Sequence, residues 1–437
     1  MNKPTNNPRD VRMRGFATRS TVEDALAWID AATTYPGWPG LERSTSETPG
    51  LPSQAQSSHP MRETIAVDRA VGRILAEDFV AEMNVPPFER SAMDGYAVIA
   101  EETTGASDYS PLPFKLVGKS MPGVPFDGTV KSGQTIRIMT GAPMPAGATG
   151  VVPVEYTTEN DDNVEITLPL PEGKHVGRIG EDIKDGTVVL KAGRILRPQD
   201  LGVIASLGAG DVTVVRRPRV RIVTTGNELA VPGSDRTEFQ IFDANTSILS
   251  ALVERDGALL ESTVRVEDTE AAIRDALTTG DVDVILVGGG SSVGAEDFAP
   301  QIVAEEGELA IHGIAMRPSS PTGLGRVGSS LVFLLPGNPV SCLCAYDFFA
   351  GRAIRKLGGR NGEWPREIVT AKLTRKISSI VGRLDYCRVA LNGSDCEPIA
   401  ISGASILSST TRADGFVIVP AGSEGYGAGS EVTVFRY

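Results

Sequence analysis

Hydrophobic positions follow a helical period in only a few stretches of the first half of the chain. Close to the N-terminus, apolar residues spaced by three and four positions predict a helix with one buried face, at Val22, Ala25, Leu26 and Ile29. Ser20 and Glu23 are expected to form a capping box at its start. Between residues 86 and 177 the pattern changes to short β-like runs separated by Gly and Pro, such as 114–117 and 135–138. We therefore expect this stretch to form a small all-β domain.

From residue 217 onward, apolar runs alternate with helical patterns. The apolar runs predict strands at 220–223, 282–287 and 331–335. The helical patterns predict helices at 245–255, 269–277 and 339–356. Such alternation is typical of a doubly wound α/β domain with a parallel sheet. Ligands bind such sheets where loops leave the carboxyl ends of the strands, so these loops are the first candidates for a functional site.

The changes of pattern also suggest domain boundaries. Residues 1–17 are expected to be a flexible tail, and residues 35–60, rich in Pro, Ser, Thr and Gly, a flexible insertion. The remaining chain is divided into a linker domain, a small β domain, the α/β domain and a C-terminal β domain, at 18–85 with 178–216, 86–177, 217–361 and 362–437. The predicted fold class is thus multi-domain, with a central doubly wound α/β domain and flanking β-rich domains.

Composition narrows the classes of function. The 437 residues carry a net charge of −13, which disfavours general nucleic-acid binding because that activity needs a basic surface. An anionic substrate would have to be held by a local cluster of Arg or Lys. The sequence contains neither a long apolar run nor an apolar leader, so we expect no membrane span and a cytoplasmic location. The four cysteines form no C-x-x-C pair and are interpreted as reduced thiols.

Five loops marked by Gly or Pro carry small hydroxyl or acidic residues. In chain order they are residues 91–98, 139–147, 224–229, 288–294 and 335–341. The last three follow predicted strands of the α/β domain, so they are expected at the ligand-binding edge of its sheet. A shared polar site is the interpretation that we adopt.

The glycine-rich loop at 288–294 is the strongest single candidate for ligand binding. Glycines let the backbone approach a ligand closely, and exposed N–H groups can hold an anion. A tight strand-to-helix turn is the alternative, although such a turn hardly needs three consecutive glycines and two serines. The residues predicted to contact the ligand are Gly288, Gly289, Gly290, Ser292 and Gly294.

Acidic residues near the loops are candidates for catalysis and for binding a divalent cation. Asp94 is flanked by apolar residues, and an acid among buried residues needs a partner or a metal. Asp297 could hold a cation or position a water, or it could be an acid favoured by a helix N-terminus. Asp243 has a helix N-cap as its alternative role, and Asp182 a turn. Glu228 lies in a loop after a strand, and Mg²⁺ prefers one or two carboxylates with phosphate oxygens.

A helix start and two arginines complete the set of candidates. Asn338 and Pro339 are placed at the beginning of a predicted helix, where free N–H groups attract anions, and Ser341 adds a hydroxyl. A capped helix start is the alternative, and both roles can hold together. The basic candidates are Arg317 and Arg388. Residues 323–328 fit G-x-G-x-x-G but precede a strand, so we reject a dinucleotide site.

Together and in this order, the five loops resemble those of the molybdopterin molybdenumtransferase family, MoeA in bacteria and the gephyrin E domain in animals. The resemblance runs from about Val22 to the C-terminus. It implies an elongated homodimer, for which the linker domain supplies the dimerisation surface. It also implies a reaction in which adenylylated molybdopterin is cleaved to AMP while molybdate is placed on the dithiolene sulfurs, with Mg²⁺ as cofactor. Further implied partners are a molybdopterin adenylyltransferase and client molybdoenzymes, in transient contact.

The resemblance also implies roles for individual residues. The implied catalytic residues are Asp94, Thr140, Asp182, Glu228, Asp243 and Asp297. Among them, Asp243 and Asp297 are assigned to the metal, and Asp94 and Thr140 would face the α/β domain of the partner chain. The loop residues of 288–294 bind substrate together with Arg317, Pro336, Gly337, Asn338, Pro339, Ser341 and Arg388.

Two parts of the chain depart from the family pattern. The usual Lys-Pro-Gly-Lys-Pro is replaced by residues 317–321, with Arg317 for the first lysine and Ser320 for the second. A serine that is frequent in the C-terminal domain falls at Ala404, next to Ser405. Both positions are associated with oxyanion binding, so a paralog specialised for tungstate or for one client enzyme remains an alternative. A molybdopterin adenylyltransferase and a non-catalytic scaffold or cofactor chaperone are the others, and the extra domains and the acidic residues argue against them.

Overall fold

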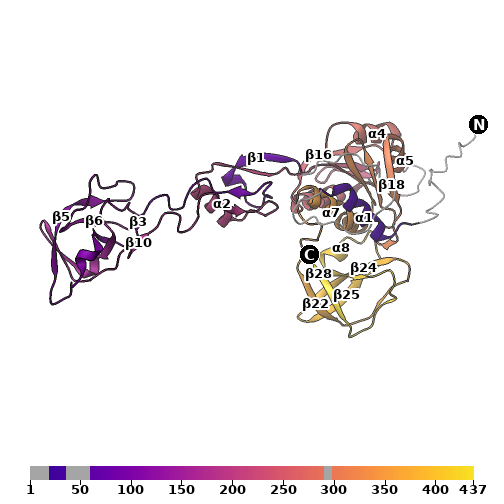
Figure 1. The fold of residues 1–437 in the computed structure, drawn as a ribbon. Coiled ribbons are helices and arrows are strands. Elements are labelled where there is room, and N and C mark those ends of the chain that lie inside the picture. Colours follow the sequence, from indigo (N-terminus) through magenta and orange to yellow (C-terminus); the bar gives the residue numbers. More distant parts are fainter. Residues whose placement is uncertain (1–18, 36–59, 290–297) are drawn as a thin grey trace, which may run out of the picture. The chain divides into compact units, whose positions relative to one another are not determined.

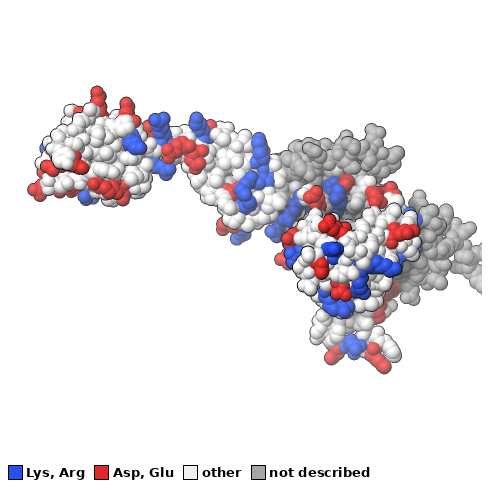
Figure 2. Space-filling view, turned by 90° about the horizontal axis from the view of Figure 1, so that it is seen from below, with Lys and Arg blue, Asp and Glu red and all other residues white. Residues whose placement is uncertain are grey.

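The computed structural model of the chain describes residues 19–35, 60–289 and 298–437. The chain divides into two compact units, drawn in Figure 1: Met1–Glu63 with Val215–Tyr437 form the first, and Thr64–Val214 form the second. Among the described helices, none is long and apolar enough to cross a membrane. On the face drawn in Figure 2, Lys and Arg are interspersed with Asp and Glu, so this face offers no continuous basic surface.

The first unit contains the predicted doubly wound α/β domain. Its six-stranded sheet has the order β16 (Leu259–Val266), β13 (Arg219–Thr225), β17 (Val284–Gly288), β21 (Ser330–Leu335), β20 (Gly323–Val327) and β18 (Gly307–His312). The first four strands are parallel, and β20 and β18 are antiparallel additions. The G-x-G-x-x-G sequence lies on β20, which confirms that it does not open a helix.

Helices cover both faces of this sheet. The helices are α3 (Asn245–Arg255), α4 (Glu270–Thr278), α5 (Ala299–Glu306), α6 (Pro339–Ala345), the π-helix η4 (Tyr346–Ala350) and α7 (Gly351–Leu357). Val284 and Leu286 of β17 enter the core beneath α3 and α6, whereas Ile285 and Val287 enter the core beneath α4 and α5. The two cores explain why this strand reads as an uninterrupted apolar run.

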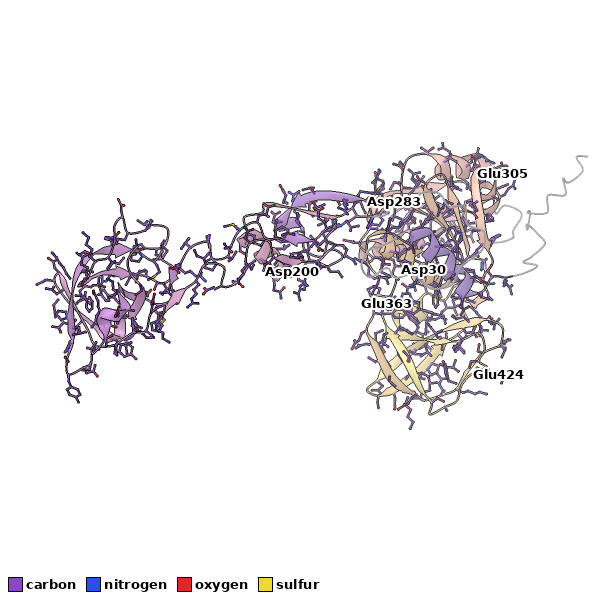
Figure 3. All side chains as sticks on the ribbon, in the orientation of Figure 1. Asp30, Asp200, Asp283, Glu305, Glu363 and Glu424 are labelled. Carbon is purple, nitrogen blue, oxygen red and sulfur yellow. The ribbon has the colours of Figure 1, made fainter. Side chains whose placement is uncertain are left out.

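Helix α1 (Val22–Thr33) also packs into the α/β domain. Figure 1 shows it beside α7. Asp30 of α1, labelled in Figure 3, accepts hydrogen bonds from Arg352 Nε at 2.8 Å and Lys356 Nζ at 2.7 Å. Its capping box is formed by Thr21 and Asp24, one residue later than predicted. The structure therefore groups this helix with the α/β core rather than with the linker segment.

The C-terminal strands of the first unit form a closed barrel. Strands β22 (Ile368–Leu373), β24 (Leu384–Asn392), β25 (Asp395–Ala400), β26 (Gly415–Val419) and β28 (Glu431–Arg436) close through the β24–β26 pairing. The short elements β14 (Leu229–Ala230), β15 (Ile241–Phe242), β23 (Ile377–Ser378), β27 (Gly425–Tyr426) and α8 (Ser408–Thr411) lie in its loops or in those of the α/β domain. Strand β19 (Met316–Arg317) comes from the α/β segment and pairs in parallel with β24, which places Arg317 opposite Asp385.

The second unit is mostly β structure. One sheet has the order β7 (Gly150–Pro153), β4 (Gly95–Val98), β6 (Gln134–Ile138), β5 (Leu112–Ser120), β9 (Asn163–Ile166) and β8 (Thr157–Asn160). The other pairs are β1 (Arg62–Ala66) with β12 (Asp211–Val215), β2 (Phe79–Val80) with β11 (Val188–Leu190), and β3 (Arg90–Ser91) with β10 (Val176–Gly177). The helical elements are η1 (Val67–Arg69), η2 (Ala100–Thr103), η3 (Val154–Tyr156) and α2 (Pro198–Ser206).

The chain enters and leaves the second unit at one place. Strands β1 and β12 pair with each other. Just outside them, the N–H of Arg216 donates to the carbonyl of Met61 at 2.8 Å. The segment 64–214 is thus an insertion whose two ends are hydrogen-bonded neighbours.

Candidate active site

Two adjoining cavities lie where the loops leave the parallel strands of the first unit. The acidic cavity has a volume of about 610 Å³ and is lined by the ends of β13, β17 and β21. The arginine cavity has a volume of about 750 Å³ and lies between residues 314–321 and the C-terminal domain. Both are lined by Pro321, Pro336 and Asn338. Their sizes are in the range of small-molecule sites, and the shared residues make one continuous region.

The acidic cavity is lined by Glu228, Asp243 and Asp268, and the described lining residues include no Lys or Arg. Glu228 is exposed and Asp268 half-buried. The N–H of Asn227 donates to Asp268 Oδ2 at 3.2 Å, which fixes this carboxylate beside the loop that holds Glu228. Asp268 is not among the residues predicted from the sequence. Asp268 lies two residues past β16, at the carboxyl end of a fourth parallel strand. This position would have allowed its prediction as a site residue.

Asp243 serves as a helix cap. Its Oδ1 accepts a hydrogen bond from the N–H of Thr246 at 3.0 Å, and its Oδ2 accepts one from the Thr246 hydroxyl at 2.5 Å. Only 7% of Asp243 is exposed. The alternative role considered from the sequence, capping of the helix that begins at Asn245, is therefore observed.

The glycine loop passes close to the end of β13. The N–H of Gly289 donates to the Leu335 carbonyl at 3.2 Å. Gly289 has φ +101°, and a Cβ atom there would lie 2.6 Å from the Thr225 carbonyl oxygen. Glycine is thus required at this position by both backbone conformation and space. The remaining predicted residues Gly290, Ser292, Gly294 and Asp297 lie outside the described residues.

The loop before α6 forms the wall between the two cavities. Asn245 Nδ2 donates to the Gly337 carbonyl at 2.8 Å, which joins this loop to α3. Pro339 occupies the first turn of α6, as predicted. The Ser341 carbonyl accepts a hydrogen bond from the Ser319 hydroxyl at 2.6 Å. Pro336, Gly337, Asn338, Pro339 and Ser341 all line one cavity or both.

The arginine cavity is lined by Arg19, Arg317 and Arg383, and its described lining residues include no acid. Arg317 Nη2 donates to Asp385 Oδ2 at 2.6 Å. Arg383 Nε lies 3.2 Å from Asp385 Oδ1. Arg383 is not among the site residues predicted from the sequence. Its approach to Arg317 depends on the β19–β24 pairing, which joins segments far apart in the sequence.

Arg388 does not line either cavity. Its side chain is fully buried, and its Nη2 donates to the Ser402 carbonyl at 2.6 Å. Ser402 lines the arginine cavity, so Arg388 supports the wall from behind. The prediction that Arg388 contacts substrate directly is corrected accordingly.

In the second unit, Asp94 and Thr140 are direct neighbours. Asp94 Oδ1 accepts hydrogen bonds from the N–H of Thr140 at 2.7 Å and from its hydroxyl at 2.8 Å. These bonds, the backbone one first, hold the pKa of Asp94 below its ordinary value. Asp94 and Met93 before it are exposed, whereas Gly95 and Tyr96 after it are buried, so the expectation of buried neighbours holds on one side only; the partner expected for Asp94 is present. Asp182 is also exposed, and its N–H donates to the Val85 carbonyl at 3.1 Å, next to the antiparallel bridge between Val85 and Ile183.

The acidic cavity offers carboxylate oxygens that could bind a cation, but its described carboxylates do not form a complete metal site by themselves. Within the described ranges, no group of three or more His, Cys, Asp or Glu could hold a metal ion. The four cysteines are free and buried, and burial raises the pKa of the Cys342 thiol to about 12. All four belong to the hydrophobic cores of the first unit. Mg²⁺ would have to be bound by one or two carboxylates with oxygens of the substrate.

Comparison with known proteins decides the family. Family models described as the MoeA N-terminal region (domain I and II), a probable molybdopterin binding domain and the MoeA C-terminal region (domain IV) match residues 20–208, 221–356 and 370–437. A molybdopterin molybdenumtransferase 2 of Mycobacterium tuberculosis is 38% identical over 75% of this chain and 83% of its own length. The chain belongs to the molybdopterin molybdenumtransferase family. A second relative, the molybdopterin molybdenumtransferase of Haemophilus influenzae, is 32% identical over 85% of this chain and 93% of its own length.

Solved structures agree with this family. Two crystal structures of molybdopterin biosynthesis MoeA proteins from Pyrococcus horikoshii superpose on the chain with TM-scores of 0.78 and 0.70, at 30% and 28% identity. Each covers 96% of this chain, and the alignments span 99% and 100% of those chains. The predicted fold class of α/β and β-rich domains is therefore confirmed, as is the resemblance to the molybdopterin molybdenumtransferase family.

The two departures from the molybdopterin molybdenumtransferase pattern both fall on the arginine cavity. Ser320 and Ala404 line it, whereas Ser405 lines the acidic cavity. The Ser320 hydroxyl oxygen is buried with no hydrogen-bond partner among the described residues. Ser319, in the place of the family glycine, has φ +86°, and its hydroxyl bond to Ser341 holds it in that conformation. Ser320 and Ala404 thus both lie on the wall of the arginine cavity.

Proposed function

We propose that this chain inserts molybdenum into adenylylated molybdopterin and releases AMP. The names of its relatives support molybdenum transfer to molybdopterin. The observation that carries the finer proposal is the junction of an acidic cavity with an arginine cavity across Pro321, Pro336 and Asn338. A nucleotide phosphoanhydride with a divalent cation suits the first cavity, and a tetrahedral oxyanion suits the second.

In the acidic cavity, Glu228 and Asp268 are the accessible carboxylates, and they would hold Mg²⁺ together with phosphate oxygens. Bound there, the cation would polarise the phosphoanhydride and supply a nucleophilic water. Asp243 fixes the start of α3 through Thr246. Gly289 lets the backbone come close to the phosphates. Asp297 remains our candidate for positioning water, on the family resemblance alone.

In the arginine cavity, Arg317 would neutralise molybdate next to the dithiolene. A guanidinium presents several N–H donors in a plane and stays charged at every working pH. Asn338, which lines both cavities, would then lie beside the bond between the pterin and nucleotide portions. Arg388 holds the Ser402 carbonyl and so fixes the far wall.

We further propose a homodimer in which Asp94 and Thr140 of one subunit complete the site of the other. The support is the family resemblance and the hydrogen-bonded pair itself, which presents an ionised carboxylate at the surface. The carboxylate is already fixed by Thr140, so it needs no reorganisation when substrate binds.

An in vitro reaction tests the proposed function. The full chain is incubated with adenylylated molybdopterin, Mg²⁺ and either molybdate or tungstate, and AMP and the metal-containing cofactor are measured. AMP release that depends on Mg²⁺, with formation of the molybdenum cofactor, is the expected result. Adenylylation of molybdopterin from ATP would instead identify an adenylyltransferase. Binding without turnover would identify a scaffold or chaperone.

A further inference from the structure

The arginine cavity contains a cation that does not come from the loop at 317–321. The family places two lysines in that loop, and this chain has Arg317 and Ser320 at those positions. Besides Arg317, the cavity wall carries Arg19 and Arg383, and Arg383 immediately precedes β24 in the C-terminal domain. The parallel register of β19 and β24 sets Arg317 opposite Asp385, so Arg383 lies two positions from the residue that Arg317 contacts.

Asp385 joins the two guanidinium groups. Its side chain is fully buried, and it accepts hydrogen bonds from Arg317 Nη2 at 2.6 Å and the Ser379 hydroxyl at 2.8 Å. Arg383 Nε is 3.2 Å from its other oxygen. The side chains of Arg317 and Arg383 keep exposed fractions of 32% and 30%. Two cations against one anion leave the wall with a net positive charge facing the cavity.

Several polar groups at this wall have no hydrogen-bond partner among the described residues. They are Arg317 Nε, Arg383 Nη2 and the Ser320 hydroxyl, whereas Arg383 Nε has its ion-pair contact with Asp385. Each of these atoms is buried, so an acceptor would reach it only after the side chain moves, and the exposed remainder of the two guanidinium groups is what faces the cavity. An ion with four oxygens, such as molybdate, offers acceptors to both guanidinium groups at once.

We propose that Arg383 is the second cation of the oxyanion subsite, in place of the lysine absent at Ser320, and that Asp385 is the positioning residue for both arginines. The identity of the anion rests on the proposed function. The assignment of Arg383 rests on the cavity lining, on its contact with Asp385 and on the partial exposure of its side chain. Guanidinium groups fixed in this way favour a tetrahedral oxyanion over a monovalent anion such as chloride.

Direct binding of molybdate and of tungstate to the full chain, measured calorimetrically without nucleotide substrate, tests this proposal. We expect Arg383→Gln and Arg317→Gln each to weaken binding about tenfold or more, as for loss of one charge-assisted hydrogen bond. Arg375→Gln is the matched control, because Arg375 lies in the same domain, is 65% exposed and pairs with Glu397 at 2.9 Å. It removes the same charge and should change affinity by less than about twofold at 0.15 M salt.

The outcomes separate the inference from the function on which it rests. Normal affinity in folded Arg383→Gln, with Arg317→Gln weakened, would overturn the role of Arg383 and leave the oxyanion site standing. If the wild-type chain binds neither anion, the oxyanion part of the proposed function fails as well. If Arg375→Gln weakens anion binding as much as Arg383→Gln does, the loss of affinity comes from the net charge of the protein and not from a specific contact of Arg383. Arg383→Lys, which keeps the charge but loses the planar group, should be intermediate and replaces Arg383→Gln if the latter does not fold.

Asp385→Asn distinguishes positioning from simple attraction. Removing a negative charge next to two arginines would strengthen a purely Coulombic site. If Asp385 positions the guanidinium groups, its loss frees them and weakens binding despite the more favourable charge. We expect weaker binding, by about threefold or more, on the scale of one lost hydrogen bond to a charged group. Tighter binding by Asp385→Asn would reject the positioning role.

Discussion

Ser320 carries a hydroxyl that is buried and unpaired among the described residues, at the wall where the family has a lysine. Ser320→Lys should place an ammonium beside Arg317 and strengthen the attraction for molybdate by about 1 kcal/mol net, after desolvation. The expected result is a severalfold lower half-saturating molybdate concentration, with AMP release at saturation little changed. Titration of molybdate against wild type and mutant measures this, with Ser394→Lys at an exposed turn as control. An unchanged half-saturating concentration would mean that residue 320 does not reach the anion.

Asp94 and Thr140 allow a second test on single residues. Thr140→Val removes the hydroxyl bond to Asp94 but leaves the backbone bond, which is the larger cause of the lowered pKa. The pKa of Asp94 should therefore rise part of the way towards its ordinary value. The pKa of Asp94 is lower in the folded chain than its ordinary value. The stabilisation by the hydrogen bonds from Thr140 is therefore fully present above the ordinary pKa, and it is lost as the pH falls through the pKa of the folded chain.

Carboxyl-carbon NMR of Asp94 across acid pH measures this change. Thr140→Ser keeps the hydroxyl and should titrate like the wild type. If Asp94 titrates in Thr140→Val as it does in the wild type, the hydroxyl bond does not contribute to the lowered pKa of Asp94.

At the scale of elements, the glycine loop after β17 shows how close packing constrains the site. Gly289→Ala introduces a Cβ atom 2.6 Å from the Thr225 carbonyl oxygen at φ +101°. It should lower the free energy of unfolding by about 1–3 kcal/mol and weaken binding in the acidic cavity. Gly288→Ala is the matched control, because its Cβ atom would lie 3.4 Å from Thr224 Cγ2. Thermal unfolding measures the stability of both variants. Equal stability of Gly289→Ala and Gly288→Ala would contradict the expected steric clash at residue 289.

Elements that bury one regular face could be predicted from the sequence, and pairings between distant segments could not. The bounds of α3 match those expected from its periodicity, and the apolar run of β17 was read correctly as a parallel strand. The long helix predicted at 339–356 contains the π-helical turn Tyr346–Ala350, which no periodic pattern reveals. The pairing of β19 with β24 has no local signal, and this pairing builds the arginine cavity.

For the candidate site, the loops could be predicted from the sequence, but the orientation of individual side chains could not. The loops that line the acidic cavity were found because strand ends of a parallel sheet converge. Arg388 was misjudged because an arginine near a site was assumed to face it, whereas this one is buried behind Ser402. The exposure of Asp94 was also misjudged, because apolar neighbours in sequence do not fix the direction of a side chain at a strand start.

At the scale of the whole molecule, the proposed homodimer predicts complementation. Asp94→Ala and Asp297→Ala chains should each be inactive, and a mixture should regain roughly a quarter to half of the wild-type activity if subunits exchange at random and one intact site forms per heterodimer. AMP release after mixing and re-equilibration is the measurement. Activity that stays absent despite demonstrated subunit exchange would reject a site shared between subunits.

The hydrogen bond between Arg216 and Met61 has a consequence for deletion of the second unit. Because the two ends of segment 64–214 meet, the segment can be gained or lost as a block without changing the strand order of the first unit. Both cavities are lined only by residues of the first unit. Removing residues 64–214 as a block would therefore leave the lining of both cavities complete, and only the contribution that we propose for Asp94 and Thr140 would be lost.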